Sequence, residues 1–425
     1  MSLSRRSFLT LASTCGLTAL WPPGWRHSLA QAQAQPQTPS VVRIAHLSSR
    51  MGPGAEMASY AVMGAQLGAE EATVTAGMFG TKVELVIEDA VPPENVASAA
   101  SKLSGQANLL AIIGALDDVA TVTLSDLAQQ QRVVFVNAAA RGGDLRGEKC
   151  HRYTFHVEPD LAMHAYAIGQ WLLQNNRKRW YFVVSGDSFG QEIYRRASDL
   201  LQQQGGMDLG RSISAPGEQD YQPVLAQLAG VEAEAIVVAL MGEELRHFLA
   251  QSKRAGLTTL IAGAPLDIVA MWQADPAYLQ GVWATSWYHE LERYSGRELN
   301  RRFAVRFGKP AEAYAWANWA AVKLLVEGAL RRASPDAVAL INYLEGAPPF
   351  DGHKGKALTF RAWNHQLRQP LFIVKARESM PEQAWNLFEV IAETPPPAMR
   401  GKPVAELLDT LGESKADSNC RLEAL

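Results

Sequence analysis

The first part of the chain alternates short apolar runs with longer stretches of helical periodicity. Four apolar runs are typical of buried strands: residues 41–47, 82–87, 109–116 and 133–136. Stretches with apolar side chains at helical spacing separate them: residues 55–75, 95–103 and 125–131. Strands that alternate with helices in this way indicate βαβ units, a parallel sheet and right-handed crossovers.

The same pattern restarts after Pro159. It predicts strands at residues 180–184, 209–214, 235–240 and 260–262. It predicts helices at residues 162–174, 191–204, 223–228 and 243–254. We therefore expect two Rossmann-like α/β units in sequence.

The last third of the chain adds elements that must return to sheets already formed. Residues 299–332 are predicted as one long helical segment. Ser334 is predicted to cap a further helix over residues 335–344. Late strands are predicted at Phe360 and at residues 371–374.

Length and composition limit the class of protein. A chain of 425 residues has room for two or three domains, and 48% hydrophobic with 20% charged residues is ordinary for a globular protein. The net charge of −3 shows no basic excess, so we expect no nucleic acid partner. Beyond the N-terminus, no apolar run is long enough to suggest a membrane span.

The N-terminus predicts export. Residues 4–9, SRRSFL, resemble the twin-arginine motif, although Thr10 stands where a lysine often follows, and an apolar region runs over residues 9–21. Small residues offer A-x-A cleavage sites: Ala30, Ala32 and Ala34. Cys15 follows only a weak lipoprotein box. We predict a signal peptide over residues 1–32, a linker over residues 33–40 and a periplasmic location.

Cysteine usage agrees with an oxidising compartment. Without the leader only Cys150 and Cys420 remain, and two thiols in the periplasm suggest one disulfide. Two separate buried thiols are the alternative. A bridge would fix the C-terminal tail, residues 396–425, to the rest of the protein.

A possible catalytic motif occurs at residues 186–190, GDSFG. It matches the G-x-S-x-G nucleophile elbow, with a predicted strand before it and a helix after it. A periplasmic hydrolase would use Ser188 as its nucleophile. The sequence offers no oxyanion segment before this serine, and the histidines after it carry no further signal: His247, His289, His353 and His365. We interpret Asp187 and Ser188 as residues that cap the following helix, and we expect no enzyme activity.

The histidines also lack zinc-ligand spacing. The chain contains no phosphate loop and no dinucleotide-binding glycine motif after its first strand. We therefore expect neither a cofactor nor a metal.

Several segments, in order and spacing, resemble one family: the type I periplasmic solute-binding proteins of the branched-chain amino acid ABC importers, which include leucine-binding proteins. The likeness covers residues 41–377. It is carried by IAHLSSRMGPGAE (44–56), KVELVIEDAVPPENVASAASKL (82–103), IIGALDDVAT (112–121), VVFVNAAARGGDLRG (133–147), YTFHVEPD (153–160), VVSGDSFGQ (183–191), RFGKPAEAYAWANWAAVKLL (306–325) and FDGHKGKALTFRAWNHQLRQPLFIV (350–374).

This resemblance implies a two-lobed α/β fold with parallel central sheets. Lobe one would comprise residues 41–159 and 286–365, and lobe two residues 160–285 and 366–395, joined by three hinge crossovers. A small ligand would be held between the lobes by hinge closure and delivered to a membrane ABC permease. We expect a monomer. A periplasmic ligand sensor of the same fold is an alternative.

The resemblance also places candidate ligand contacts, but with departures from the family pattern. In amino acid binders, hydroxyl and N–H groups of two turns hold the ligand carboxylate, and an acidic residue past the first hinge holds the ammonium. Here Asp118 and Arg141 replace the family's hydroxyl residues, and Asp160 lies beside the acidic position. An aspartate repels a carboxylate, whereas an arginine can bind one with two hydrogen bonds. These departures put leucine-type specificity in doubt.

Asp117 and Asp118 have two interpretations. They could accept hydrogen bonds from hydroxyl or ammonium groups, or pair with Arg141 in a structural salt bridge. The other candidate contacts are Ser48, Ser49, Arg50, Ala139, Phe189, Met241 and Trp287. Trp287 and Tyr288 could form an aromatic wall of the site or pack in the core.

A finer resemblance involves three short segments: LRGEKC (145–150), WNHQLRQP (363–370) and LLDTLG (407–412). They are similar to a solute-binding subgroup associated with pyrroloquinoline-quinone-dependent alcohol oxidation. The matching cysteines of that subgroup favour pairing of Cys150 with Cys420. The expected ligand is amino acid-like, or an alcohol or carboxylate metabolite.

Overall fold

The computed structural model describes residues 40–48, 54–89, 95–115, 117–332, 334, 336–378, 383–396 and 401–423. All of them belong to one compact unit, Pro39–Leu425. The predicted signal peptide, its cleavage sites, Cys15, Ser49 and Arg50 lie outside the described residues. Among the described helices, none has both the length and the apolar character needed to span a bilayer.

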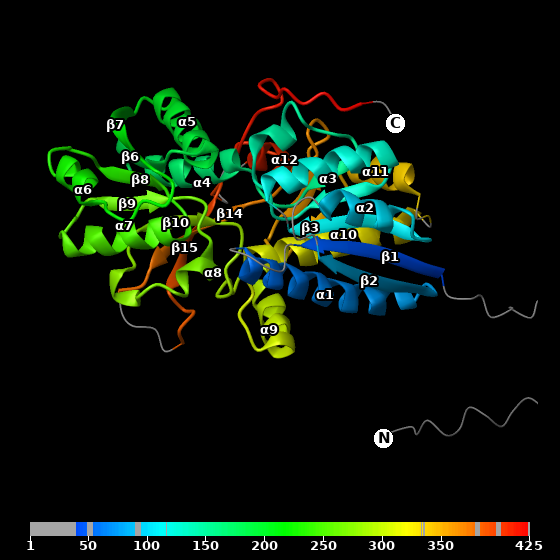
Figure 1. Ribbon diagram of the computed structural model, residues 1–425. Helices are drawn as coiled ribbons and strands as arrows, with labels where there is room; N and C mark the ends of the chain where they lie inside the picture. The colour runs from blue at the N-terminus through cyan, green and yellow to red at the C-terminus, as the bar shows by residue number, and fades with distance from the viewer. Residues whose placement is uncertain are drawn as a thin grey trace, which may run out of the picture. The chain divides into compact units, whose positions relative to one another are not determined.

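The first sheet has five parallel strands, and Figure 1 shows it in blue and cyan. Its order is β2 (Thr81–Asp89), β1 (Ser40–Ser48), β3 (Leu109–Ala115), β4 (Val134–Asn137) and β5 (Thr154–His156). Successive residues of β1 point to opposite faces, as strand geometry requires. Val42 and Ile44 join the core cluster on one face, whereas Ala45 and Leu47 join the cluster on the other.

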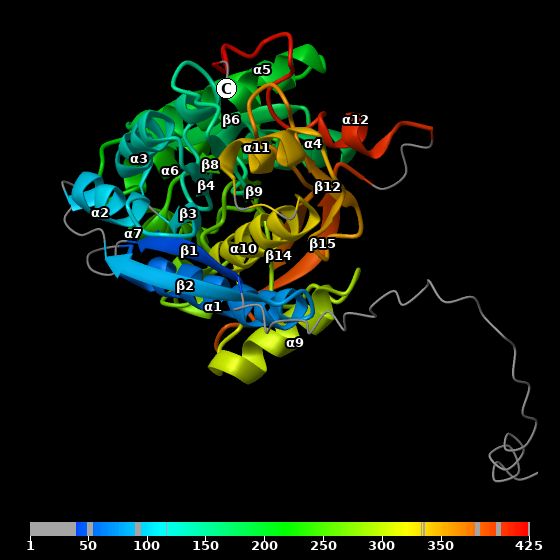
Figure 2. The same cartoon turned by 90° about the vertical axis from the view of Figure 1, so that its right-hand side faces the viewer.

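Helices cover both faces of this sheet. One core cluster contains residues of α1 (Ala55–Gly77) and α10 (Ala313–Arg332), and the other contains residues of α2 (Asn95–Ser104) and α3 (Asp118–Gln131). Figure 2 shows α1 and α10 near β1 and β2. The two helices approach closely because α1 has a glycine at Gly64: a Cβ there would lie 2.0 Å from the carbonyl oxygen of Ala315.

The second sheet has seven strands. Its order is β15 (Phe388–Thr394), β14 (Leu371–Ala376), β10 (Val282–Thr285), β9 (Leu260–Gly263), β8 (Ala235–Ala239), β6 (Arg179–Ser185) and β7 (Met207–Ser214). The strands from β10 to β7 are parallel, whereas β14 and β15 are each antiparallel to the neighbouring strand.

Helices also cover both faces of the second sheet. One core cluster contains side chains of α4 (Leu161–Gln174) and α5 (Ser188–Gln203). The other contains side chains of α6 (Gln222–Leu228), α7 (Gly242–Arg254) and α8 (Ile268–Met271). We call each sheet with its helices a lobe. The predicted two-lobed α/β fold is confirmed, and the exact residue limits of the lobes remain a prediction.

The chain passes between the lobes three times. After β5 it enters α4, which packs against the second sheet. After β10 it returns through α9 (Gly296–Phe307) to α10, which contacts α1 and β3. It then forms a small antiparallel sheet of β11 (Phe350–Asp351), β12 (Ala357–Phe360) and β13 (Leu367–Arg368), and finally adds β14 beside β10.

The structure corrects two predicted helices. Residues 299–332 do not form one segment, because Gly308 ends α9 with a positive φ of 68° and Pro310 follows before α10 begins. The cap of α11 (Ala337–Glu345) is Asp336 rather than Ser334: its carboxylate accepts a hydrogen bond of 2.8 Å from the N–H of Ala339.

Several short elements were missed because their patterns are too brief to identify in a sequence. They are α8, β10 and α12 (Val404–Leu408). The longer strand β15 was not predicted either. The predicted disulfide is confirmed, since Cys150 and Cys420 are bonded and their Cα atoms lie 5.6 Å apart.

Candidate functional site

The candidate site begins at the turn that follows β4. The side-chain oxygen of Asn137 accepts hydrogen bonds from the N–H groups of Ala139 (3.1 Å) and Ala140 (2.9 Å). The fully buried Arg146 donates to the carbonyl oxygens of Ala140 (3.0 Å) and Glu158 (2.8 Å). These bonds fix the turn to the first crossing between the lobes, and they thereby position Arg141.

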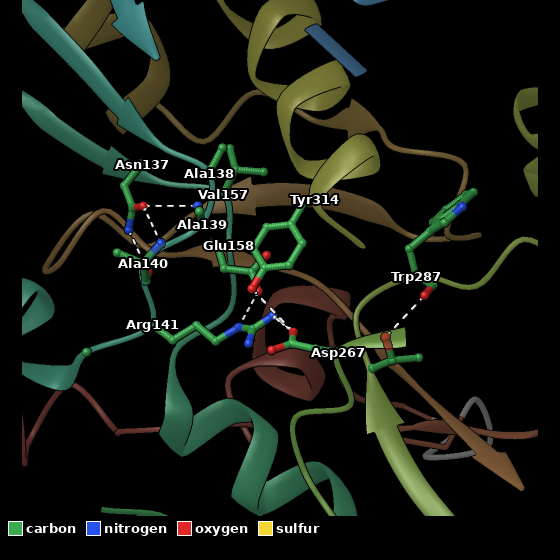
Figure 3. A network of polar contacts seen from close by, with 12 residues as sticks. Asn137, Ala138, Ala139, Ala140, Arg141, Val157, Glu158, Asp267, Trp287 and Tyr314 are labelled. Atoms are coloured by element: carbon green, nitrogen blue, oxygen red, sulfur yellow. Dashed lines mark hydrogen bonds and ion pairs between the residues drawn. The ribbon is translucent and has the colours of Figure 1, made fainter. Parts of the chain in front are cut away.

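The guanidinium of Arg141 joins the two lobes. Its Nε donates to Oε1 of Glu158 at 2.7 Å, and its Nη2 donates to Oδ1 of Asp267 at 2.9 Å. Glu158 follows β5, whereas Asp267 lies between β9 and β10 of the second lobe. The guanidinium carbon also lies 5.1 Å from the ring centre of Tyr314 at the start of α10. Figure 3 shows Arg141 between these three side chains.

Tyr314 adds a second link between the lobes. Its hydroxyl donates to the same Asp267 oxygen at 3.3 Å. Arg141 is 8% exposed, Tyr314 9% and Glu158 0%, so the group is almost removed from water. Charged hydrogen bonds in such surroundings are stronger than on an exposed surface.

The pKa shifts reflect this burial. Burial opposes the charge of Arg141, but the carboxylates of Asp267 and Glu158 outweigh it and raise the arginine pKa above its ordinary value. Burial raises the pKa of Glu158, although Arg141 counteracts this shift. The second oxygen of Glu158, Oε2, is buried without a hydrogen-bond partner among the described residues.

Both members of the aspartate pair accept hydrogen bonds from backbone N–H groups. Oδ1 of Asp118 accepts from the backbone N–H groups of Arg141 and Gly142, each at 3.0 Å, and does not bond to the guanidinium. Asp117 caps α3 by accepting from the N–H of Ala120 at 2.8 Å. The salt bridge with the Arg141 side chain, one of the two interpretations left open, is not formed, because Glu158 and Asp267 bond to that side chain. Contact of the aspartates with a ligand remains a prediction.

A further buried carboxylate lies at the start of α10. Glu312 accepts hydrogen bonds from the N–H groups of Tyr314 (2.9 Å) and Ala315 (2.7 Å) and is 2% exposed. Burial raises its pKa to about 8, although these two N–H groups lower it.

This shift predicts a pH dependence of stability. Between pH 4.5 and about 8 the unfolded chain ionises Glu312, whereas the folded protein retains the proton. The stabilising contribution of Glu312 is therefore fully present below pH 4.5, and it is lost as the pH rises through about 8. Glu312→Gln should flatten the curve of unfolding free energy against pH in this interval, as measured by urea denaturation. The control Glu298→Gln, at a carboxylate with a lowered pKa, should keep the wild-type slope. An unchanged slope in Glu312→Gln would contradict the assignment.

The other predicted contacts fall in different environments, and their roles as ligand contacts remain predictions. Ser48 ends β1 with a buried hydroxyl that has no hydrogen-bond partner among the described residues. Asp160 caps α4 through a 2.6 Å hydrogen bond from the N–H of Met163. Phe189 is partly buried at the start of α5, and Met241, 39% exposed, precedes α7.

Trp287 is fully buried and packs in the core. Its ring stacks on Trp316 at a centre distance of 5.8 Å, and its Nε1 donates to Asn300 at 2.8 Å. Figure 3 shows it apart from the group around Arg141. Tyr288 is also fully buried, and its hydroxyl donates to the carbonyl oxygen of Phe388 at 2.9 Å. Both aromatic side chains make the contacts of core residues.

The GDSFG turn is a helix start. Asp187 caps α5 by accepting from the N–H of Gly190 at 3.0 Å and from the Ser185 hydroxyl at 2.5 Å. Ser188 is the first residue of α5 and is exposed, and within the described chain no histidine bonds to its hydroxyl. The turn provides a cap without catalytic partners.

Two substitutions test this assignment. Ser188→Ala should change the free energy of unfolding by less than about 0.5 kcal/mol, because the side chain is exposed. Asp187→Ala should cost about 1 kcal/mol, because the cap is lost. Urea denaturation measures both. An ester-hydrolysis assay that detected turnover in the wild type and none in Ser188→Ala would contradict this interpretation.

Three residues that contact the Arg141 side chain were not predicted from the sequence: Glu158, Asp267 and Tyr314. The buried Glu312 was not predicted either. Glu158 and Tyr314 lie within segments that carry the family resemblance, but no periodicity distinguishes them from structural residues. A cavity of about 780 Å³ lies between α9 and the β14–β15 connection. None of the predicted ligand contacts that the structure describes lines this cavity.

Among the described residues, no group of three or more histidine, cysteine or acidic side chains could hold a metal ion.

Comparison with known proteins gives consistent matches. A family model described as periplasmic binding protein matches residues 41–381. The Leu/Ile/Val/Thr-binding protein of Salmonella typhimurium (strain LT2) is 22% identical over 311 residues, which is 72% of this chain and 84% of that protein.

Solved structures show the same fold at low sequence identity. A branched-chain amino acid ABC transporter periplasmic ligand-binding protein from Burkholderia xenovorans LB400 has a TM-score of 0.80 at 18% identity, covering 89% of this chain and 99% of that chain. An ABC transporter solute-binding protein from Rhodopseudomonas palustris BisB5, in complex with 3,4-dihydroxybenzoic acid, has a TM-score of 0.69 at 18% identity. That alignment covers 83% of this chain and 97% of the other.

Proposed function

Because the chain belongs to the periplasmic binding protein family, we propose that it is of the branched-chain amino acid ABC transporter type, captures a small polar ligand between its lobes and delivers it to an ABC permease. The family implies a periplasmic location and a binding protein rather than an enzyme. Capture would proceed by hinge closure, in which contacts made by both lobes favour the closed form.

The contact of Arg141 with Asp267 is the observation that carries this proposal. A bond between two lobes exists only while the lobes are close together, so it stabilises the closed form alone. The three crossings provide the short connections about which two rigid lobes can rotate. The hydroxyl of Tyr314, from the first lobe, supports the same closure through Asp267.

The charges around Arg141 favour a ligand that donates hydrogen bonds. The guanidinium is bonded to two carboxylates, and a buried oxygen of Glu158 has no partner among the described residues. An amino or hydroxyl group would satisfy that oxygen, whereas a carboxylate alone would be repelled. We propose an amino acid-like ligand or an alcohol or hydroxyl-bearing carboxylate metabolite.

A thermal-shift screen of amino acids, alcohols, diols, carboxylates and amines tests the proposal, since a bound ligand raises the melting temperature. Isothermal titration of a ligand found by the screen should then show at least about tenfold weaker binding to Asp267→Asn, because one charged bond of the closed form is lost. The control Asp199→Asn, exposed on α5, should bind as the wild type does. Equal affinity in all three proteins would exclude Asp267 from closure.

Two finer assignments remain proposals. Export by the twin-arginine route depends on residues 4–9, and membership of the subgroup associated with pyrroloquinoline-quinone-dependent alcohol oxidation is supported by the Cys150–Cys420 bond.

A sensor of the same fold would bind ligand equally well. Co-purification of an ABC permease, rather than a receptor, would distinguish transport from sensing.

A further inference from the structure

The C-terminal segment makes contacts with both lobes. We call residues 401–423 the C-terminal strap. It begins with α12, which packs against β12, and the side chains of Leu408 and Leu411 are fully buried. Leu411 joins the core cluster of the second lobe. Figure 1 shows the strap in red near α4 and α5.

The first half of the strap is bound to helices of the second lobe. Gln170 of α4 donates to the carbonyl oxygen of Thr410 at 2.8 Å. Arg196 of α5 lies 3.3 Å from a carboxylate oxygen of Glu413, and each of these side chains is 16% exposed. These contacts bond this half of the strap to the second lobe.

The same half is bound beside the third crossing. One oxygen of Asp409 accepts from Nε of Arg361 and from Nε of Arg368, each at 2.8 Å. Arg361 is completely buried and also donates to the carbonyl oxygen of Leu411 at 2.5 Å. The two arginines flank β13, immediately before the chain crosses into β14.

The second half of the strap is bound to the first lobe. Cys420 is disulfide-bonded to Cys150, which lies between the short helix η1 (Gly143–Arg146) and β5. Glu423 contacts His151 at 2.7 Å and accepts from the backbone N–H of Arg152 at 3.2 Å. This half therefore moves with the first lobe.

We propose that the chain link from Glu413 to the disulfide-bonded Cys420 ties the lobes together beside their crossings and limits the rotation of one lobe against the other. The inference rests on the proposed function, because hinge rotation is the motion that is limited. Only six residues lie between the anchors Glu413 and Cys420, and the seven Cα–Cα steps that join them span at most about 25 Å. Larger separations of the two anchors are therefore excluded while the chain and the disulfide are intact.

Cutting the strap between its anchors tests this inference without removing any anchor contact. Residues 414–417 are exposed, so a recognition sequence for a specific protease can replace them. Fluorophores introduced through non-canonical amino acids at Val74 and Met207, which are 73% and 53% exposed, report the distance between the lobes by single-molecule energy transfer. Cleavage of the folded, disulfide-bonded protein should broaden the distance distribution by about half or more.

A matched control places the same recognition sequence at residues 215–217, which form an exposed loop within the second lobe. Cleavage there should leave the distribution unchanged. An unchanged distribution after complete cleavage of the strap would overturn the inference, and so would equal broadening in the control.

The same distance measurements distinguish a failure of the strap restraint from a failure of the proposed function. If a ligand from the screen shifts the distance in the uncut protein while cutting the strap has no effect, hinge closure stands and the strap restraint is overturned. If cutting broadens the distribution while no ligand shifts it, the restraint stands and ligand-driven closure is overturned.

Discussion

Replacing Arg141 by methionine is expected to lower the free energy of unfolding by about 3–5 kcal/mol. The change leaves Glu158 fully buried without its cation, and Asp267 loses its charged bond to the first lobe and keeps only the hydroxyl of Tyr314. A buried carboxylate without a partner is costly because water no longer solvates its charge. Urea denaturation of the two proteins at neutral pH measures the difference.

Two further variants isolate the cause. Arg141→Met combined with Glu158→Gln and Asp267→Asn should recover at least half of the loss, because the unpaired charges are removed. The control Arg301→Met removes an arginine that is 62% exposed and paired with Glu298, and it should cost less than about 1 kcal/mol. A loss of less than about 1 kcal/mol in Arg141→Met would show that the bonds of Arg141 to Glu158 and Asp267 contribute little to stability.

Replacing Cys150 and Cys420 together by serine should lower the free energy of unfolding by about 3–5 kcal/mol. The bond joins residues 270 positions apart, so its loss releases a very long loop in the unfolded chain. Denaturation in guanidinium chloride without reductant compares the wild type with the double variant.

Reduction of the wild type provides the matched control for this second result. Dithiothreitol should move the wild-type midpoint to that of the double variant, and it should leave the double variant unchanged. A double variant within about 1 kcal/mol of the oxidised wild type would mean that the noncovalent contacts of the strap hold it alone.

Part of the candidate site was predictable because backbone turns follow local rules. Asp187, between a predicted strand and a predicted helix, was expected to cap the helix and does so. Asp117 and Asp160 also cap helices, although they were predicted only as ligand contacts. Glu312 was not identified, because its importance depends on a burial that no periodic pattern displays.

The partners of Arg141 illustrate the same limit. Glu158 is 17 residues from Arg141 in sequence, and Asp267 is 126 residues away on the other lobe. No local pattern specifies that these side chains meet, since their contact depends on three crossings and on the packing of two separate cores. The family resemblance indicated Arg141 as a candidate ligand contact, which remains a prediction, but it did not indicate that Glu158 and Asp267 would bond to its guanidinium.

By itself, the sequence determined most of the alternation of strands and helices, the two α/β units, the helix cap at Asp187 and the presence of Cys150 and Cys420 in the mature part expected for the chain. These features follow from side-chain periodicity and from local hydrogen bonding, which neighbouring residues specify. Only the tertiary structure decided that Arg141 bonds to both lobes and that the C-terminal strap contacts both. Such contacts join residues far apart in the chain, and their strength depends on burial that arises only when the lobes pack.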